Sequence, residues 1–284
     1  MWVSDYCKLC LIQSRCRDLL IFGRGDLLPY LLKYLGNILG NMRRSEAFTE
    51  SYTFIKSLLN SEDPYSEIKE KLSMKAIKVA EEVRSYLSES GWDLIKALEF
   101  SAASNIIDTS VLGFEPKELK NAIWDTSVLN EFCGIPGDKV VLAPDNAGEF
   151  EVDLILAEAL INNGYEVTLV VRSKSYEIDV TYDEVVNRAL GRRFKVLSVP
   201  NNMPPSAYVE DGFLISKGIA NAEAYLELNP NIDSIHLFRT KCDILSKIFS
   251  VPKNSTLIVS GKTLVNFISN ASTSLRSIAN ELIG

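Results

Sequence analysis

Histidine is nearly absent from this chain of 284 residues, which contains only His236. This scarcity excludes a metal site built from several histidines, and a Ser-His-Asp catalytic group would depend on His236 alone. His236 lies in the largely apolar run SIHLFRTK, which predicts a buried strand. We therefore interpret it as a histidine of the core.

Long apolar runs and an excess of positive charge are also missing. No apolar stretch of the sequence reaches the ~20 residues that a membrane-spanning helix needs. The formal net charge of −7 argues against nucleic acid or an anionic membrane surface as the main partner. We expect neither of them as a partner, and the oligomeric state is left open.

The beginning of the chain has Asp5 and no basic region ahead of an apolar stretch, so it does not resemble a signal peptide. The number of cysteines is odd, at five. Without a secretory signal, this number favours reduced thiols and a cytoplasmic protein. Cys7 and Cys10, in CKLC, supply half of a tetrahedral zinc site, and no second CxxC exists to complete it. Whether these two thiols bind a metal ion is left open.

Helical periodicity dominates the first part of the sequence. Residues 66–90 and 93–108 place apolar side chains at helical spacing, and Pro116 stands in the first turn of a further predicted helix. No segment of this part alternates convincingly with a period of two. We predict a helical N-terminal domain that covers residues 1–132.

Strands and helices alternate in the second part, residues 133–284. Short runs rich in β-branched residues, of which the first is KVVLA at 139–143, are separated by helical patterns. Continuous apolar strands of this kind indicate a mainly parallel sheet that is covered on both faces. We predict an α/β fold, in which the helical N-terminal region packs on a Rossmann-like three-layer α/β/α sandwich.

The segment VVLAPDNAGEFEVDLILAEAL, residues 140–160, is apolar at both ends and polar in the middle. Asp145 and Asn146 stand where the first predicted strand of this part ends and the next helix begins. Ligands of parallel sheets bind beyond the carboxyl ends of the strands. Carboxylate and amide oxygens suit divalent cations such as Mg²⁺ or Mn²⁺. The joint therefore predicts a metal site, and the alternative is that both residues only cap the helix.

Polar side chains also follow three later predicted strands. They are Asp179 and Thr181, then Ser216, Lys217, Gly218, Asn221 and Glu223, and last Arg239, Lys241 and Cys242. The carboxylates come first and the cations last. We expect a metal ion beside Asp145 and Asp179, and a phosphate group between the ion and Lys241.

Asn105 and Asp108 are candidates to join this site from the helical part. Their i and i+3 spacing in SAASNIID would place them on one face of a helix, after small residues that permit close approach. The alternative is a solvated polar stripe. Established phosphate-binding motifs do not fit elsewhere: SGKT at 260–263 follows a strand as in a P-loop, but Thr256 stands where the first glycine is required.

Six segments, taken in order, resemble the metal-dependent damage-control phosphatases, a family once described as a domain of unknown function. The resemblance is to the archaeal branch with an N-terminal CxxC, which is related to the ARMT-like domain proteins. The segments are CKLC (7–10), ASNIID (103–108), PDNAGE (144–149), DVT (179–181), ISKGIANAE (215–223) and KC (241–242). This family usually has an asparagine directly before the DVT motif, where this chain has Ile178, so the hydrogen bonds of that asparagine are missing.

The resemblance implies a phosphatase that uses one divalent metal ion, such as Mn, Ni, Co or Mg. Its substrates would be phosphate monoesters of small, damaged or side-product phosphometabolites such as sugar phosphates. The second predicted domain, 133–284, would then be the metal-binding catalytic domain. The implied metal ligands are Asp145, Asn146 and Asp179, and the residues implied to bind substrate are Asn105, Ser216, Gly218, Asn221 and Lys241.

The proposed catalytic residues are Lys241, which would balance charge on the phosphoryl group, and a carboxylate that handles the attacking water. Asp145 and Asp108 are both candidates for that carboxylate. Two other functions stay open. One is an S-adenosylmethionine-dependent carboxyl methyltransferase, although the glycine-rich strand-end loop expected for that cofactor is absent. The other is a non-catalytic protein that binds a metal ion or a metabolite.

Overall fold

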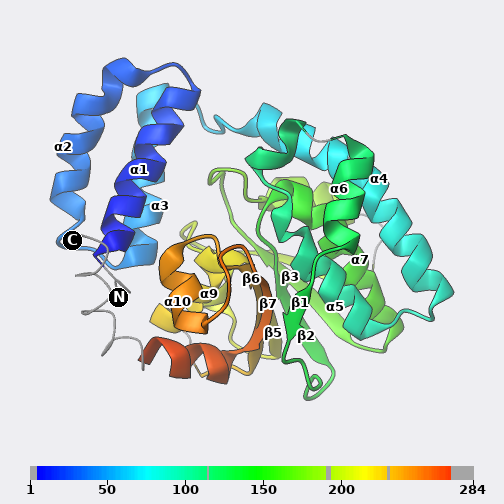
Figure 1. The fold of residues 1–284 in the computed structure, drawn as a ribbon. Coiled ribbons are helices and arrows are strands. Elements are labelled where there is room, and N and C mark those ends of the chain that lie inside the picture. Colours follow the sequence, from blue (N-terminus) through cyan, green and yellow to red (C-terminus); the bar gives the residue numbers. More distant parts are fainter. Residues whose placement is uncertain (1–4, 114, 190–192, 229–230, 270–284) are drawn as a thin grey trace. The chain divides into compact units, whose positions relative to one another are not determined.

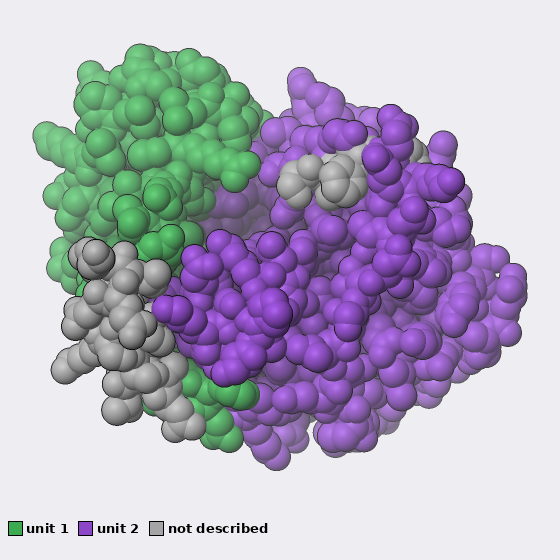
Figure 2. Space-filling view, in the orientation of Figure 1, with its two compact units in different colours: residues 1–64, 266–284 green, residues 65–265 purple. Residues whose placement is uncertain are grey.

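The computed structural model describes residues 5–113, 115–189, 193–228 and 231–269 (Figure 1). It divides into two compact units, residues 1–64 with 266–284 and residues 65–265, which Figure 2 colours separately. In the first unit, helices pack around fully buried apolar side chains such as Leu11 and Ile55. These helices are α1 (Tyr6–Ile21), α2 (Leu28–Ile38) and α3 (Arg44–Leu59).

Among the described residues, the second unit is built on a seven-stranded sheet with the order β1-β7-β6-β5-β2-β3-β4. Neighbouring strands run parallel, except that β6 and β7 pair antiparallel. The mainly parallel sheet of the prediction is therefore confirmed. The strands are β1 (Val128–Asn130), β2 (Lys139–Ala143), β3 (Glu166–Val171), β4 (Lys195–Ser198), β5 (Phe213–Lys217), β6 (Ser234–Arg239) and β7 (Thr256–Ser260).

Helices cover both faces of this sheet, as its buried central strands require. Figure 1 shows α4 to α7 on one side and α9 with α10 on the other. The helices are α4 (Ser66–Glu89), α5 (Leu94–Ala103), α6 (Pro116–Trp124), α7 (Ala147–Asn162), α8 (Tyr182–Ala189), α9 (Gly218–Leu228) and α10 (Asp243–Phe249). None of the helices in the described part of the chain combines the length and the apolar character needed to cross a membrane.

The direction in which the chain moves across the sheet reverses between β2 and β5. From β2 the chain proceeds through α7 to β3, whereas from β5 it proceeds through α9 to β6 on the opposite side. Because parallel crossovers are right-handed, the two helices lie on opposite faces. The carboxyl ends of β2 and β5 thus form a topological switch point, which is where ligands bind in sheets of this type.

The compact units differ from the predicted division at residues 132 and 133. Helices α4, α5 and α6 belong to the same unit as the sheet, because α4 and α5 pack against α7. The Oγ of Ser73 in α4, for example, donates to the carbonyl of Ala147 at 3.2 Å. The change of pattern near residue 132 marks the start of strand–helix alternation. Even this start is slightly earlier than predicted, since β1 forms the sheet edge at Val128–Asn130.

Candidate active site at the sheet switch point

The loops that follow β2 and β3 are joined by backbone hydrogen bonds. The N–H of Val180 donates to the carbonyl of Asp145 at 3.0 Å, and the N–H of Ala147 donates to the carbonyl of Ile178 at 2.8 Å. Asn146 and Asp179 face each other across this short antiparallel bridge. The three residues predicted as metal ligands therefore lie together, although 33 positions separate Asn146 from Asp179 (179 − 146).

Asn146 occupies the N-cap position of α7, but its side chain makes no capping hydrogen bond. Its amide nitrogen donates instead to the carboxylate of Glu149. A residue that only capped the helix would accept a hydrogen bond from the N–H groups of the first turn. The capping alternative therefore does not account for this side chain.

Asp179 is buried and paired with a cation. Its Oδ2 accepts from the Nε of Arg172 at 2.5 Å, and the guanidinium of Arg172 also donates to the carbonyl of Asn202 at 2.6 Å. Burial raises the pKa of Asp179 to about 6, although Arg172 opposes the rise. Arg172 thus holds one face of this carboxylate in place.

Asp145 lies close to two other acidic side chains. Removal from water raises the pKa of Asp145 well above its usual range, and the carboxylates of Asp179 and Glu149 raise it further. Lys241 and Arg172 oppose this rise, so the ammonium group of Lys241 acts on the same carboxylate. The carboxylates of Asp145 and Asp179 raise each other's energy at this separation, and a cation between them would relieve the repulsion. This donor set fits a divalent ion that prefers oxygen ligands.

The start of α9 is pressed against Asp145. Gly218 has φ of +75°, and a Cβ atom built on it would lie 1.9 Å from Oδ2 of Asp145. Only glycine combines this backbone conformation with this close approach. The start of α9, directly after β5, therefore lies beside the loop that follows β2.

Asn221 and Ser216 are brought to the same region but are buried. The Nδ2 of Asn221 donates to the carbonyls of Pro144 and Lys217, at 3.1 and 2.9 Å, and its Oδ1 accepts from the N–H of Ser206 at 3.1 Å. The side chain therefore ties the ends of β2 and β5 together. Ser216 is fully buried, and its hydroxyl has no hydrogen-bond partner among the described residues.

Asn105 and Asp108 do not share a helix face, so that prediction is wrong. Helix α5 ends at Ala103, Asn105 lies in the 3-10 turn η2 (Ser104–Ile106), and Asp108 follows that turn. Asn105 nevertheless contacts the last residue of β6, and Asp108 contacts the loop that follows β6. Oδ1 of Asn105 accepts from the N–H of Arg239 at 3.2 Å, and Oδ2 of Asp108 lies 3.3 Å from Nζ of Lys241.

A buried charged cluster beneath these residues was not predicted. The Nζ of Lys217 lies 3.3 Å from Oε2 of Glu149 and 3.1 Å from Oδ1 of Asp153, and all three side chains have no exposed surface. Burial opposes the charge of Lys217, but the two carboxylates outweigh it and raise its pKa. The available signal was the i and i+4 spacing of Glu149 and Asp153 in a helix whose other residues are mostly apolar.

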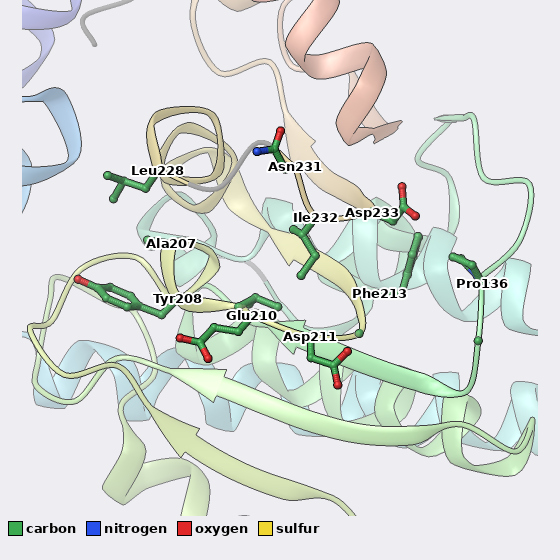
Figure 3. A pocket seen from close by; sticks show the side chains of 13 residues that line it. Pro136, Ala207, Tyr208, Glu210, Asp211, Phe213, Leu228, Asn231, Ile232 and Asp233 are labelled. Atoms are coloured by element: carbon green, nitrogen blue, oxygen red, sulfur yellow. The ribbon is translucent and has the colours of Figure 1, made fainter.

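Other features lie apart from this site. A pocket of about 790 Å³ opens at the amino ends of β5 and β6, lined by residues such as Glu210, Asp211 and Asp233 (Figure 3). None of the predicted site residues lines it. Within the described ranges, no group of three or more His, Cys, Asp or Glu residues is arranged to hold a metal ion. This also means that no such group completes a zinc site around Cys7 and Cys10, which lie in α1.

The reversal between β2 and β5, with acidic and amide side chains gathered there and a lysine nearby, defines a doubly wound α/β protein with an acidic site at its switch point. The chain belongs to the damage-control phosphatase ARMT1-like domain family, whose model matches residues 30–257. The family to which the sequence segments pointed is thus confirmed, and membership supports hydrolase activity of the phosphatase type.

Individual relatives agree with this assignment. The chain is 24% identical to a damage-control phosphatase of Archaeoglobus fulgidus over 196 residues, 62% of this chain and 68% of the relative. It is 22% identical to an uncharacterized protein of Methanocaldococcus jannaschii over 237 residues, 74% of this chain and 78% of that protein. The crystal structure of a DUF89 family protein from Pyrococcus horikoshii has the same fold. The two structures superimpose with a TM-score of 0.77 and are 21% identical in sequence, and the match covers 92% of this chain and 99% of the other.

Proposed function

We propose that this protein is a metal-dependent phosphatase that hydrolyses phosphate monoesters of small phosphometabolites at the β2–β5 switch point. Family membership supports the phosphatase class. The observation that carries the site assignment is the bridge between Asn146 and Asp179, which gathers two carboxylates and an amide from separate loops. Asp145, Asn146 and Asp179 are assigned to hold one divalent cation.

The residues around the cation would divide the remaining work. When bound, the ion supplies positive charge that stabilises the transferring phosphoryl group. Lys241 would balance charge on the phosphoryl oxygens that face away from the ion, because phosphoryl transfer depends mainly on position and electrostatics. Asp108 lies 3.3 Å from Lys241 and is assigned to accept a proton from the attacking water, since Asp145 is assigned to the ion.

The substrate is expected to be a small phosphorylated metabolite that enters the site from solvent. Lys241 and Asp108 are partly exposed, at 38% and 26% of their side-chain surfaces, so this end of the site is open to solvent. Asn105, Ser216, Gly218 and Asn221 are buried. We therefore assign their contribution to the shape of the site floor, and the contact with phosphate to Lys241.

The experiment that tests the proposal replaces the assigned ligands. Purified Asp145→Asn and Asp179→Asn variants are compared with the parent for thermal stability, Mn²⁺ affinity and hydrolysis of p-nitrophenyl phosphate and sugar phosphates, with Mg²⁺, Mn²⁺, Co²⁺ and Ni²⁺ in turn. Both variants should stay folded and lose activity. Their Mn²⁺ affinity should fall by at least ~10–100-fold, which is the loss seen when a residue that only contacts a metal ligand is replaced. Hydrolysis with unchanged metal dependence would contradict the site.

Lys241→Ala separates the phosphate role from the metal role. It should lower the rate of ester hydrolysis by about 10²-fold or more, as does loss of one charge-stabilising donor, while Mn²⁺ affinity stays near that of the parent. Lys253→Ala is the control, because Lys253 pairs with Asp243 on the surface. Methyl transfer from S-adenosylmethionine without any ester hydrolysis would favour the methyltransferase alternative instead.

A further inference from the structure

Glu149 lies in the first turn of α7, and its carboxylate accepts hydrogen bonds from three different side chains. The amide nitrogen of Asn146 donates to Oε1, and that of Asn105 lies 2.9 Å from Oε1 and 2.8 Å from Oε2. The ammonium of Lys217 lies 3.3 Å from Oε2. Glu149 and Lys217 are completely buried, so water cannot substitute for any of these partners.

This arrangement fixes the direction in which both amides point. An asparagine side chain has a donor end and an acceptor end, whereas an ionised carboxylate can only accept. Both amino groups must therefore face Glu149, and both carbonyl oxygens must face away. For Asn105 the consequence is visible, because its oxygen accepts the N–H of Arg239 at 3.2 Å. For Asn146 the amide nitrogen is the end that faces Glu149, which leaves its oxygen for other contacts, and the backbone of this residue pairs with that of Asp179.

We propose that Glu149, which accepts from both amides and contacts Lys217, is a positioning residue that presents the oxygen of Asn146 to the divalent cation. The inference rests on the proposed function, since it concerns the same metal site. A cation binds the carbonyl oxygen of an amide and is repelled by its amino group. Without the carboxylate at position 149, the amide of Asn146 can rotate by half a turn and offer the wrong end.

A purely structural role for the cluster is the competing explanation. Lys217 also contacts Asp153 and the hydroxyls of Ser101 and Ser104, and so connects β5, α7 and the end of α5. Buried ion pairs of this kind contribute little net stability, because the cost of removing the charges from water offsets their attraction. The two explanations differ in what Glu149 and Asp153 should do. Both carboxylates contact Lys217 from the same helix, but the hydrogen bonds from the two amides go to Glu149.

The test compares Glu149→Gln with Asp153→Asn. Each variant removes one buried carboxylate from Lys217, so both should lower the thermal unfolding temperature. Mn²⁺ is titrated into the metal-free proteins by calorimetry. We expect the Kd for Mn²⁺ to rise about 10–100-fold in Glu149→Gln, the range known for residues that orient metal ligands, and to stay near the parent value in Asp153→Asn. Equal weakening in the two variants would overturn the proposal.

A charge-conserving exchange provides the second test and covers the case in which Glu149→Gln does not fold. The double variant Asn146→Asp with Glu149→Gln keeps one carboxylate and one amide but reverses their order. The amide at position 149 can then donate to the carboxylate at position 146, which offers its other oxygen to the ion. Mn²⁺ affinity should return to within about 10-fold of the parent. A double variant that binds no better than Asn146→Ala would contradict the positioning role.

The failure of this inference differs from the failure of the proposed function. Normal Mn²⁺ binding in Glu149→Gln together with loss in Asp145→Asn overturns the positioning role and leaves the metal site intact. Normal Mn²⁺ binding in both variants overturns the metal site itself.

Discussion

His236 illustrates how a single buried residue is constrained by its surroundings. Its Nε2 lies 3.1 Å from the hydroxyl of Ser234, and its ring packs 4.5 Å from that of Tyr225. Nδ1 has no hydrogen-bond partner among the described residues. Burial lowers the pKa of His236 to about 3. The imidazole is therefore neutral in the folded protein at neutral pH, as expected of a core histidine.

We predict that His236 does not titrate in the folded protein between pH 8 and pH 5. It is the single histidine of the chain, so its imidazole proton resonances are identified without assignment. In the unfolded chain its pKa is near the ordinary 6.5. Between about pH 3 and pH 6.5, the unfolded state binds more protons at His236 than the folded state does. The stability that depends on neutral His236 is therefore fully present above pH 6.5 and is lost as the pH falls below that value.

The free energy of unfolding should fall, because of His236, by at most about 1.4 kcal/mol for each pH unit. Chemical unfolding at pH 7.5 and pH 5.5 should therefore show a steeper fall for the parent than for His236→Phe, whose carboxylates are the same. A resonance that titrates near pH 6.5 in the native protein would show that the ring is accessible to water.

At the scale of elements, the joint between β5 and α9 depends on Gly218. We predict that Gly218→Ala weakens Mn²⁺ binding, because the added methyl group displaces the carboxylate of Asp145. Gly164→Ala is the matched control: Gly164 also has positive φ, +92°, but nothing lies within 4 Å of a Cβ built there. Both variants should lose about 1–2 kcal/mol of stability from the left-handed backbone. Calorimetric titration with Mn²⁺ should distinguish them, and equal affinities would remove Gly218 from the site.

The elements themselves could largely be predicted from the sequence, because apolar runs and helical spacing report burial directly. The end of α5 at Ala103 could not, since SAASN contains neither glycine nor proline, and Asn105, in the 3-10 turn that follows, makes its contacts with residues distant in the sequence. The cluster of Lys217 with Glu149 and Asp153 was likewise hidden. Each of its members looks like an ordinary polar residue until the fold brings β5 beneath α7.

At the scale of the whole molecule, the position of a domain boundary is set by packing. Thirteen of the sixteen residues of α7 are buried, and α4 and α5 pack against this helix. We predict that a fragment of residues 65–265 unfolds cooperatively and binds Mn²⁺, whereas a fragment of residues 133–284 aggregates. The second fragment exposes the apolar surface of α7 and lacks Asn105 and Asp108. Circular dichroism and size-exclusion chromatography measure both outcomes, and a stable, monomeric 133–284 fragment would restore the boundary predicted from the sequence.

The backbone bridge between the two site loops determines which substitutions these loops can accept. Ile178 contributes its carbonyl oxygen, which accepts the N–H of Ala147 at 2.8 Å, while its own side chain is buried. Every residue type carries that oxygen, so an isoleucine at position 178 closes the joint as well as another residue type would. Asp145 and Asp179 have no such freedom, because their assigned contribution is made by the side chain. Neighbouring positions in one short loop are thus open to substitution to very different degrees.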